Sequence, residues 1–330
     1  KLLPLFLIKI LLPMKKLLTY ENYLVALMAL IFGCIFFDRL ALNFLIPYVA
    51  KDLHLSDTQI GLLAGALSFA WAISSYSTTA FAEAKNAKRI VFLLGVLVFS
   101  ICSFGSGLAN GFVVLLLARL VMGMAEGPVI PLAQSFVEKE SSAHRLGMNA
   151  GILQAVGSAL CGSILAPVIL VQIAEKMGWR EAFFIAGTPG IILGFIAYFT
   201  LKSNTTDNTE TKVVQEAGIS ELLKYKNVRK SMGIACAIFG WWFATLPFIT
   251  KFFVEVQGMS GDEMGKTMGL LGVSGLLSAI IVPTLSDKFG RRKILLIFVL
   301  IGVFYPLCVQ FLAGSALHLP AMFITYFMMG

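Results

Sequence analysis

Long apolar runs separated by short polar loops constrain this chain more than any other feature of its sequence. A helix needs about 20 apolar residues to cross a bilayer, and it satisfies its own backbone hydrogen bonds where lipid cannot. Because 58% of the 330 residues are hydrophobic and only 13% are charged, the composition is far more apolar than that of a soluble domain. The sequence therefore predicts an all-α integral membrane protein. We expect spans at residues 23–49, 58–81, 90–109, 111–137, 147–174, 182–201, 231–256, 264–285, 294–315 and from 319 to the end.

Basic residues fall unevenly between alternate loops. With the N-terminus placed in the cytoplasm, 19 of the 26 Lys and Arg residues lie in cytoplasmic loops and five lie in the opposite loops. Such a bias fixes orientation under the positive-inside rule, so we predict a multi-pass protein of the cell (inner or plasma) membrane with a cytoplasmic N-terminus. The net charge of +8 then follows from topology and requires no nucleic acid partner.

The sequence repeats itself. Shifting the chain by 204 residues aligns Gly61 with Gly265, and the loop FAEAKNAKRI, from Phe81, with LSDKFGRRKI, from Leu285. The repeat predicts two halves of six spans related by an axis along the membrane normal, with a binding site between them at the bilayer midplane. The second half is incomplete because the tenth run, from residue 319, holds about 12 residues, too few to cross. We therefore expect a chain that stops there not to transport by itself.

The domain organisation follows from the repeat. We interpret residues 1–13 as a non-native or upstream segment, 14–201 as the first half, 202–230 as a cytoplasmic linker and 231–330 as the second half. The linker ends in ISELLKYKNVRK, an amphipathic helix whose basic face suits the cytoplasmic leaflet. We expect a monomer embedded in the lipid bilayer.

The loop PTLSDKFGRRK, from Pro283 to Lys293, resembles the signature loop of the major facilitator superfamily, and it follows the eighth span, where that family carries its repeat copy. The resemblance covers residues 14–330 and implies the fold of that family, two six-helix halves related by a parallel repeat. In the family this loop is a cytoplasmic latch. Its acid, here Asp287, caps a neighbouring helix and pairs with basic groups, which holds the outward-facing state.

The first copy of this loop departs from the family's pattern, with Thr79 and Asn86 in place of glycines and Glu83 in place of the aspartate. For residues 283–293 the alternative interpretation is a solvated loop that merely obeys the positive-inside rule. The gating residues that the resemblance implies are Glu83, Lys88, Arg89, Asp287, Lys288, Gly290, Arg291 and Arg292.

Four ionisable residues interrupt the apolar runs of the first and fourth spans, namely Asp38, Arg39, Arg119 and Glu126. An ionised side chain at the bilayer centre costs roughly 2.5 to 3.5 kcal/mol on insertion scales. Arg119 and Glu126 are two helical turns apart and share a face, whereas Asp38 and Arg39 are adjacent and point about 100 degrees apart. One of the adjacent pair can therefore line a central cavity while the other reaches a neighbouring helix.

Two interpretations of these four charges remain open. In the first they form structural salt bridges, because their charges sum to zero and mutual pairing lowers the cost of burial. In the second they form a proton site and an anion site. Burial favours the neutral form of a carboxyl group and a nearby arginine favours the charged form, so a substrate anion that binds the arginine would release the acid to take a proton.

The same residues resemble the anion:cation symporter branch of the superfamily. The matching motifs are Asp38-Arg39 in the first span, Arg119 with Glu126-Gly127-Pro128 in the fourth, and Gln154 with Gly157 in the fifth. The resemblance implies that Arg39 holds the substrate carboxylate and that Asp38 and Glu126 bind protons. It also implies that Arg119 tunes these acids and that Gln154 forms hydrogen bonds to substrate hydroxyls.

Further pocket walls are predicted from aromatic and small residues. Trp71 stands where the branch often has a tyrosine, and Trp241, Trp242 and Thr245 in the seventh span are candidate walls from the second half, although tryptophans also face lipid and interfaces. A stripe of small residues predicts a helix-packing seam. It consists of Gly147, Gly151, Ala155 and Ala159.

These features favour a proton-coupled symporter that imports a small organic anion, such as a sugar acid or an aromatic acid, by alternating access. One alternative is a spinster-like lipid or lysolipid carrier, because LSDTQIGLLAG and GWREAFFIAGTPG also resemble that group. Another is a non-transporting membrane receptor. We expect no enzyme, no catalytic residue, no metal and no cofactor, because the sequence carries no nucleophile, metal or cofactor constellation. The expected partners are the organic anion, protons and lipid.

Overall fold

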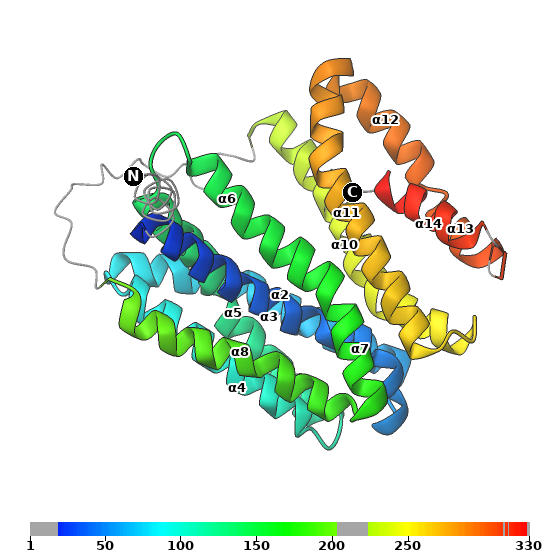
Figure 1. The fold of residues 1–330 in the computed structure, drawn as a ribbon, viewed down its shortest axis with the longest axis horizontal. Helices are drawn as coiled ribbons and strands as arrows, with labels where there is room; N and C mark the ends of the chain where they lie inside the picture. The colour runs from blue at the N-terminus through cyan, green and yellow to red at the C-terminus, as the bar shows by residue number, and fades with distance from the viewer. Residues whose placement is uncertain (1–18, 203–223, 313, 316, 329–330) are drawn as a thin grey trace, which may run out of the picture.

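The structure, a computed structural model, consists of helices and connecting loops over the residues it describes, which are 19–202 and 224–328 without 313 and 316. The predicted segment 1–13 and most of the predicted linker 202–230 lie outside the described residues. In chain order (Figure 1) the elements are α2 (Tyr20–Asp52), α3 (Asp57–Ala84), α4 (Lys88–Gly107), α5 (Phe112–Glu140), α6 (Leu146–Gln154), the π-helical η1 (Ala155–Leu165), α7 (Ala166–Lys176), α8 (Trp179–Thr200), α10 (Lys226–Glu255), α11 (Gly261–Phe289), α12 (Arg291–Gly302), α13 (Tyr305–Phe311) and α14 (His318–Phe327).

Nine helical segments in the described part of the chain are long and apolar enough to cross a membrane. They lie at the first nine predicted spans, and the all-α membrane fold is confirmed. The fifth span is built from α6, η1 and α7 together, and the ninth from α12 and α13. α14 overlaps the predicted tenth span and begins one residue before it.

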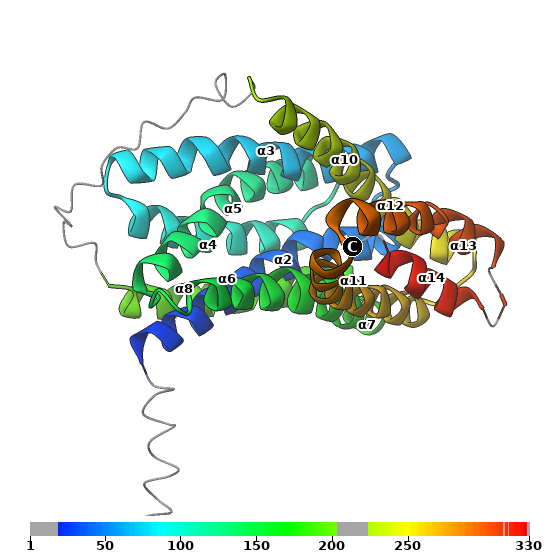
Figure 2. The ribbon, with the colours of Figure 1, turned by 90° about the horizontal axis from the view of Figure 1, so that it is seen from above.

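α2 is the central helix of the first half. In its most apolar stretch 72% of the residues are buried inside the protein, against at most 50% in any other described span. Figure 2 shows α2 running between α4 and α5 on one side and α6 and α8 on the other. Because other helices cover most of this stretch, a polar side chain near the middle of α2 meets other helices rather than lipid.

The internal repeat is visible in how α3 and α11 begin. Each starts with a capping box, in which the side chain of the cap residue accepts a bond from the third helical N–H and the third side chain accepts one in return. The pair is Ser56 with Gln59 in α3, and Ser260 with Glu263 in α11. The two boxes are 204 residues apart, the same shift as in the sequence.

The loops that follow these two helices also match. Asn86 adopts a φ of 51 degrees and Gly290 a φ of 95 degrees, and these positions are again 204 residues apart. Only glycine, and more rarely asparagine or aspartate, adopts this left-handed region readily. The asparagine in the first loop therefore shares a positive φ with the glycine in the second.

The two halves meet at one end of the bundle, which we call the closed end and which holds the loops after α2, α7 and α10. Figure 1 shows α7 and the start of α11 converging there. Polar contacts between described residues join the halves at this end: Lys251 pairs with Asp57, the Thr250 hydroxyl donates to the Asn43 carbonyl at 2.7 Å, and the Asp262 N–H donates to the Glu175 carboxylate at 3.0 Å.

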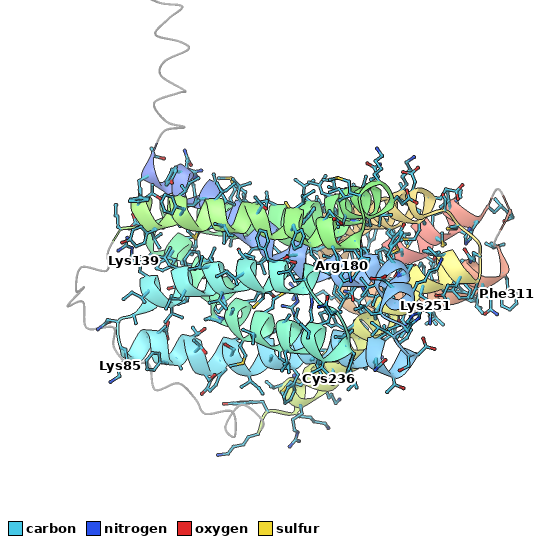
Figure 3. All side chains as sticks on the ribbon, turned by 90° about the horizontal axis from the view of Figure 1, so that it is seen from below. Lys85, Lys139, Arg180, Cys236, Lys251 and Phe311 are labelled. Atoms are coloured by element: carbon cyan, nitrogen blue, oxygen red, sulfur yellow. The ribbon has the colours of Figure 1, made fainter. Side chains whose placement is uncertain are left out.

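The halves diverge toward the opposite end, which we call the basic end and which holds the loops after α3, α5 and α11. Lys85 and Lys139 lie at that end and Lys251 toward the other (Figure 3). Among the described side chains of α10, none before Leu246 is buried, and in α11 none after Ser278 is buried. The contact between the halves is therefore confined to the closed end and the middle of the bundle.

This divergence changes the predicted role of the small-residue stripe in α6 and η1. A Cβ added at Gly147 or Gly151 would meet no atom within 4 Å among the described residues. The predicted packing seam is therefore not formed there, because the start of α6 lies at the basic end, where the halves are apart.

Close helix packing between the halves occurs instead along α11. A Cβ at Gly265 would lie 2.9 Å from the Pro167 carbonyl oxygen, and one at Gly272 would overlap the Ser163 carbonyl group. Small residues let helix backbones approach in a membrane, where apolar burial contributes little to association. The glycines of α11 therefore set how tightly the closed end can shut.

We predict that Gly265→Leu weakens this closure. Overpacking a tight contact costs about 1–3 kcal/mol, enough to lower the closed population about tenfold. The measurement is disulfide cross-linking between cysteines introduced at Gln172 and Asp262, whose side chains lie 3.4 Å apart, in a protein without its five native cysteines. Gly105→Leu is the control, because a Cβ at Gly105 meets nothing within 4 Å. Equal cross-linking in both variants would contradict the assignment.

Candidate functional site

The candidate site is organised by two adjacent residues of α2, Asp38 and Arg39. Their side chains leave the helix about 100 degrees apart, and both are buried, with 0% and 8% of their surface exposed. The Arg39 guanidinium lines a cavity between the halves. The Asp38 carboxylate instead reaches α4, where it accepts a hydrogen bond from the Ser103 hydroxyl at 2.8 Å.

Arg39 lies between an acid and an aromatic ring. Its Nη1 is 3.9 Å from a carboxylate oxygen of Glu126, which is fully buried on α5. Its guanidinium lies over the Trp71 ring of α3, 4.7 Å from the centroid. A cation over a tryptophan face is attracted by the ring quadrupole, more so away from water. Trp71 and Glu126 therefore hold the guanidinium from two sides.

Arg119 occupies the other side of the site and is 1% exposed. Its guanidinium lies over the Phe183 ring of α8, 4.9 Å from the centroid, and its Nη1 donates to the Met122 sulfur at 3.3 Å. It interacts electrostatically with both Asp38 and Glu126. Two arginines and two acids from α2 and α5 thus form one buried charge network.

Several buried polar atoms of this network have no hydrogen-bond partner among the described residues. They are Oδ2 of Asp38, both carboxylate oxygens of Glu126, Nε and Nη2 of Arg119, and Nε1 of Trp71. Buried polar groups are nearly always paired, and an unpaired one calls for an explanation. They are concentrated in one charge network whose two arginines line a cavity, which is typical of a site built to contact a polar ligand.

The cavity between Arg39 and Arg119 has a volume of about 20 Å³, which is room for about one water molecule. Its other polar lining residues, Asn43 and Ser68, were not predicted, and neither was Phe243, which closes it from the second half. Asn43 follows Arg39 by four residues and so shares its helical face, which the sequence spacing could have revealed. No sequence signal places Phe243 opposite α2.

The structure brings together five of the nine predicted proton and substrate residues, namely Asp38, Arg39, Trp71, Arg119 and Glu126. Trp242 lines a second cavity of about 20 Å³ between the halves. Trp241 is exposed, and the Thr245 hydroxyl donates to the Trp241 carbonyl within α10. Gln154 is exposed at the end of α6 and lines neither of these cavities.

The predicted gating residues lie at the basic end. Glu83 pairs with Lys88 at 2.9 Å across the first loop, and Asp287 pairs with Arg291 at 3.4 Å across the second. Arg89 donates to the Tyr198 carbonyl of α8. The remaining members, Lys288, Gly290 and Arg292, are exposed. Each acid thus pairs within its own loop in this conformation, and the latch role of Asp287 stays a prediction.

The comparison with known families agrees with this architecture. The sequence model of the Major Facilitator Superfamily matches residues 28–330. The two repeated halves and the family match indicate a multi-pass transporter fold rather than an enzyme. The chain belongs to the Major Facilitator Superfamily, and the fold implied by the signature loop is confirmed.

Curated relatives include carriers of anions. A hexuronate transporter of Bacillus subtilis is 28% identical over 272 residues, which are 78% of this chain and 63% of that protein. A probable sulfoacetate transporter of Cupriavidus necator is 22% identical over 295 residues, 84% of this chain and 68% of that protein. The chain therefore spans about two thirds of the length of these relatives.

Solved structures share the fold at low identity. A bacterial homologue of the human lysosomal transporter Spinster, in an inward-facing and unoccupied conformation, aligns with a TM-score of 0.76 and 21% identity over 95% of this chain and 74% of that one. A D-xylose-proton symporter aligns with a TM-score of 0.71 and 17% identity, over 94% and 81% of the two chains.

We predict that Asp38 and Arg119 are energetically coupled. Removing one member of a buried charge network leaves the opposite charge less compensated, and breaking a buried pair in this way costs about 3–5 kcal/mol. The double variant Asp38→Asn/Arg119→Gln should therefore lose less stability than the sum of the single variants, by about 1–3 kcal/mol. Thermal unfolding of the four purified proteins measures this difference.

The matched control is the pair Asp52 and Arg180 at the closed end, whose charged atoms lie 2.7 Å apart and are partly exposed. Exposed pairs contribute about 1 kcal/mol or less, so the cycle Asp52→Asn/Arg180→Gln should be nearly additive. Additivity to within about 0.5 kcal/mol at Asp38 and Arg119 as well would show that the buried charges are independent.

Proposed function

We propose that this protein is a proton-coupled symporter that imports a small organic anion by alternating access. The observation that carries the proposal is the position of Arg39, which lines the cavity between the halves and lies 3.9 Å from the buried Glu126. A guanidinium facing a cavity can bind a carboxylate through two parallel hydrogen bonds. The ion pair is long, and neither Glu126 oxygen has a hydrogen bond from the described residues. A substrate anion can therefore take the place of the Glu126 carboxylate beside Arg39.

Charge balance explains how binding would be coupled to protons. The four buried side chains sum to zero charge when both acids are ionised. An anion that enters between Arg39 and Arg119 adds negative charge to a site of low dielectric, where an uncompensated charge is costly. A proton taken up by Glu126 restores neutrality. The loaded site can then change its exposure with little net charge buried.

The substrate class is supported by the relatives. Hexuronate and sulfoacetate, named for the two curated proteins, are both small molecules with at least one acidic group. The predicted gating loops and most of the basic residues lie at the basic end, so the positive-inside rule places that end in the cytoplasm. The structure would then be an inward-facing conformation, with its closed end directed outward.

The experiment is uptake by the full-length protein in lipid vesicles with an imposed pH gradient. Labelled hexuronate, sulfoacetate, benzoate and a lysophospholipid are offered in parallel. We expect accumulation of at least one of the three small anions, and its loss when a protonophore collapses the gradient. Accumulation of the lysophospholipid alone would favour a lipid carrier, and binding without any flux would favour a receptor; either result would overturn the proposal.

We predict that Arg39→Lys lowers substrate affinity about tenfold or more although the charge is kept, because an ammonium cannot form the paired bonds of a guanidinium. Arg180→Lys is a matched control, since Arg180, like Arg39, lies over a tryptophan ring and pairs with a carboxylate, here that of Asp52, but at the closed end. Equilibrium binding is measured for both variants. An Arg39→Lys affinity within about threefold of wild type would make Arg39 a structural residue.

We predict that Glu126→Gln separates two transport modes. The amide mimics the protonated acid, so the loaded carrier can still change its exposure, but the empty carrier has no proton to release. Accumulation driven by a pH gradient should collapse, whereas exchange of labelled for unlabelled substrate should continue. Asp38→Asn is assayed alongside to find which acid carries the coupled proton.

The control for this pair of assays is Glu140→Gln, because Glu140 pairs with Lys202 outside the cavity and should leave both modes intact. Loss of both modes in Glu126→Gln would indicate a structural ion pair. Undiminished accumulation would remove Glu126 from the mechanism.

A further inference from the structure

The Ser103 hydroxyl occupies a position between two acceptors from different helices. Ser103 is fully buried on α4. Its Oγ lies 2.8 Å from Oδ1 of Asp38 on α2 and 2.9 Å from the carbonyl oxygen of Phe183 on α8. A hydroxyl has a single hydrogen to donate, so at any moment it satisfies only one of these two acceptors.

Which acceptor it satisfies follows from the protonation state of Asp38. A charged carboxylate only accepts hydrogen bonds, so Ser103 must donate to it. A protonated carboxyl group has a hydrogen of its own, which it can donate to a lone pair of Ser103, and the Ser103 hydrogen is then released to the Phe183 carbonyl. In both states the Ser103 hydrogen has an acceptor, and the two states differ in the direction in which the hydrogen bonds between Asp38, Ser103 and the Phe183 carbonyl run.

The position of Ser103 is unlike that of its neighbours on the same helix. Ser100 and Ser106 are equally buried, but each donates to the carbonyl group four residues earlier in α4, the usual bond of a buried helical serine. Ser103 instead reaches α2 and α8. Gly187 permits this approach, since a Cβ there would lie 2.9 Å from the Ser103 Cβ.

The contact continues to the second arginine of the site. The Phe183 whose carbonyl faces Ser103 also provides the ring under the Arg119 guanidinium, 4.9 Å away. A change in the protonation state of Asp38 therefore alters, through the Ser103 hydroxyl, the hydrogen bonding of Phe183, whose ring contacts the Arg119 guanidinium. No proton is transferred to Ser103, because the proton comes from solution and stays on Asp38.

Asp38 has other titratable groups around it, but among the described residues none of them forms a hydrogen bond to its carboxylate. Those that interact with it electrostatically are Arg119 and Glu126 on α5, Cys102 on α4 and Cys34 on α2. From α8 the contact with this group is the Phe183 carbonyl, through Ser103.

We propose that Ser103 is the positioning residue of Asp38, a hydroxyl that bonds the charged carboxylate and turns to the Phe183 carbonyl when Asp38 is protonated. The proposal rests on the proposed function in one respect, namely that Asp38 changes its protonation state during transport. In this proposal, the charged and protonated states of Asp38 differ in the direction of a hydrogen-bond chain that runs from α2 through α4 to α8.

The test is infrared difference spectroscopy of the purified protein between high and low pH, with no substrate present. Asp38→Asn identifies the carbonyl stretch of the protonated Asp38 by its disappearance. Hydrogen bonding lowers this stretch, so Ser103→Ala should move the band to a higher wavenumber. Ser103→Cys, which keeps a weak donor and acceptor, should give an intermediate position. Ser106→Ala is the matched control and should leave the band in place.

A band that stays at its wild-type position in Ser103→Ala, or that moves equally in Ser106→Ala, would overturn the proposal. So would the absence of any protonated Asp38 band in the wild-type protein. These results are independent of the uptake assays. Proton-driven anion uptake with an unmoved band would leave the proposed function intact and remove Ser103, whereas a moved band without anion uptake would do the reverse.

Discussion

The structure depends on the compensation of four charges that have been removed from water. Each ion buried without a partner costs several kcal/mol, and Asp38, Arg39, Arg119 and Glu126 are all nine-tenths or more buried. The compensation requires α2 at the centre of the first half, since it carries one member of each sign. It also requires α5 beside it to supply the other two, and the aromatic rings of α3 and α8 to support the guanidinium groups.

The compensation is balanced in charge but incomplete in hydrogen bonds. The contact between Arg39 and Glu126 is long, and six buried polar atoms of Asp38, Trp71, Arg119 and Glu126 have no hydrogen-bond partner in the described part of the chain. A fully satisfied network would be a purely structural element. A network that balances charge but leaves hydrogen bonds unmade can exchange one of its own carboxylates for the carboxylate of a ligand.

The contact between the halves complements this local chemistry. The halves touch at the closed end through the Lys251–Asp57 pair and the glycines of α11, and they diverge at the basic end. The cavity of about 20 Å³ between them is too small for a sugar acid, since it holds about one water molecule. A change in the angle between the halves would therefore both enlarge the site and change the side from which it is reached.

Much of this arrangement could be predicted from the sequence. Apolar run length gave the nine spans, the shift of 204 residues gave the repeat, and helical geometry indicated that Asp38 and Arg39 diverge. Contacts between distant segments could not be predicted, because no local pattern encodes them. Ser103 meets Asp38 across 65 residues, and Phe243 closes a cavity lined by α2, α3 and α5. The seam predicted at Gly147 and Gly151 failed because the stripe could not reveal which conformation the halves adopt.

The central claim is that an anion takes the place of Glu126 beside Arg39 and thereby loads a proton. Isothermal titration calorimetry of anion binding, in buffers of different ionisation enthalpy at one pH, measures the number of protons taken up on binding. The account predicts an uptake of about one proton for each anion bound, and none in Glu126→Gln. Binding with no proton uptake in the wild-type protein, at any pH where the anion binds, would contradict it.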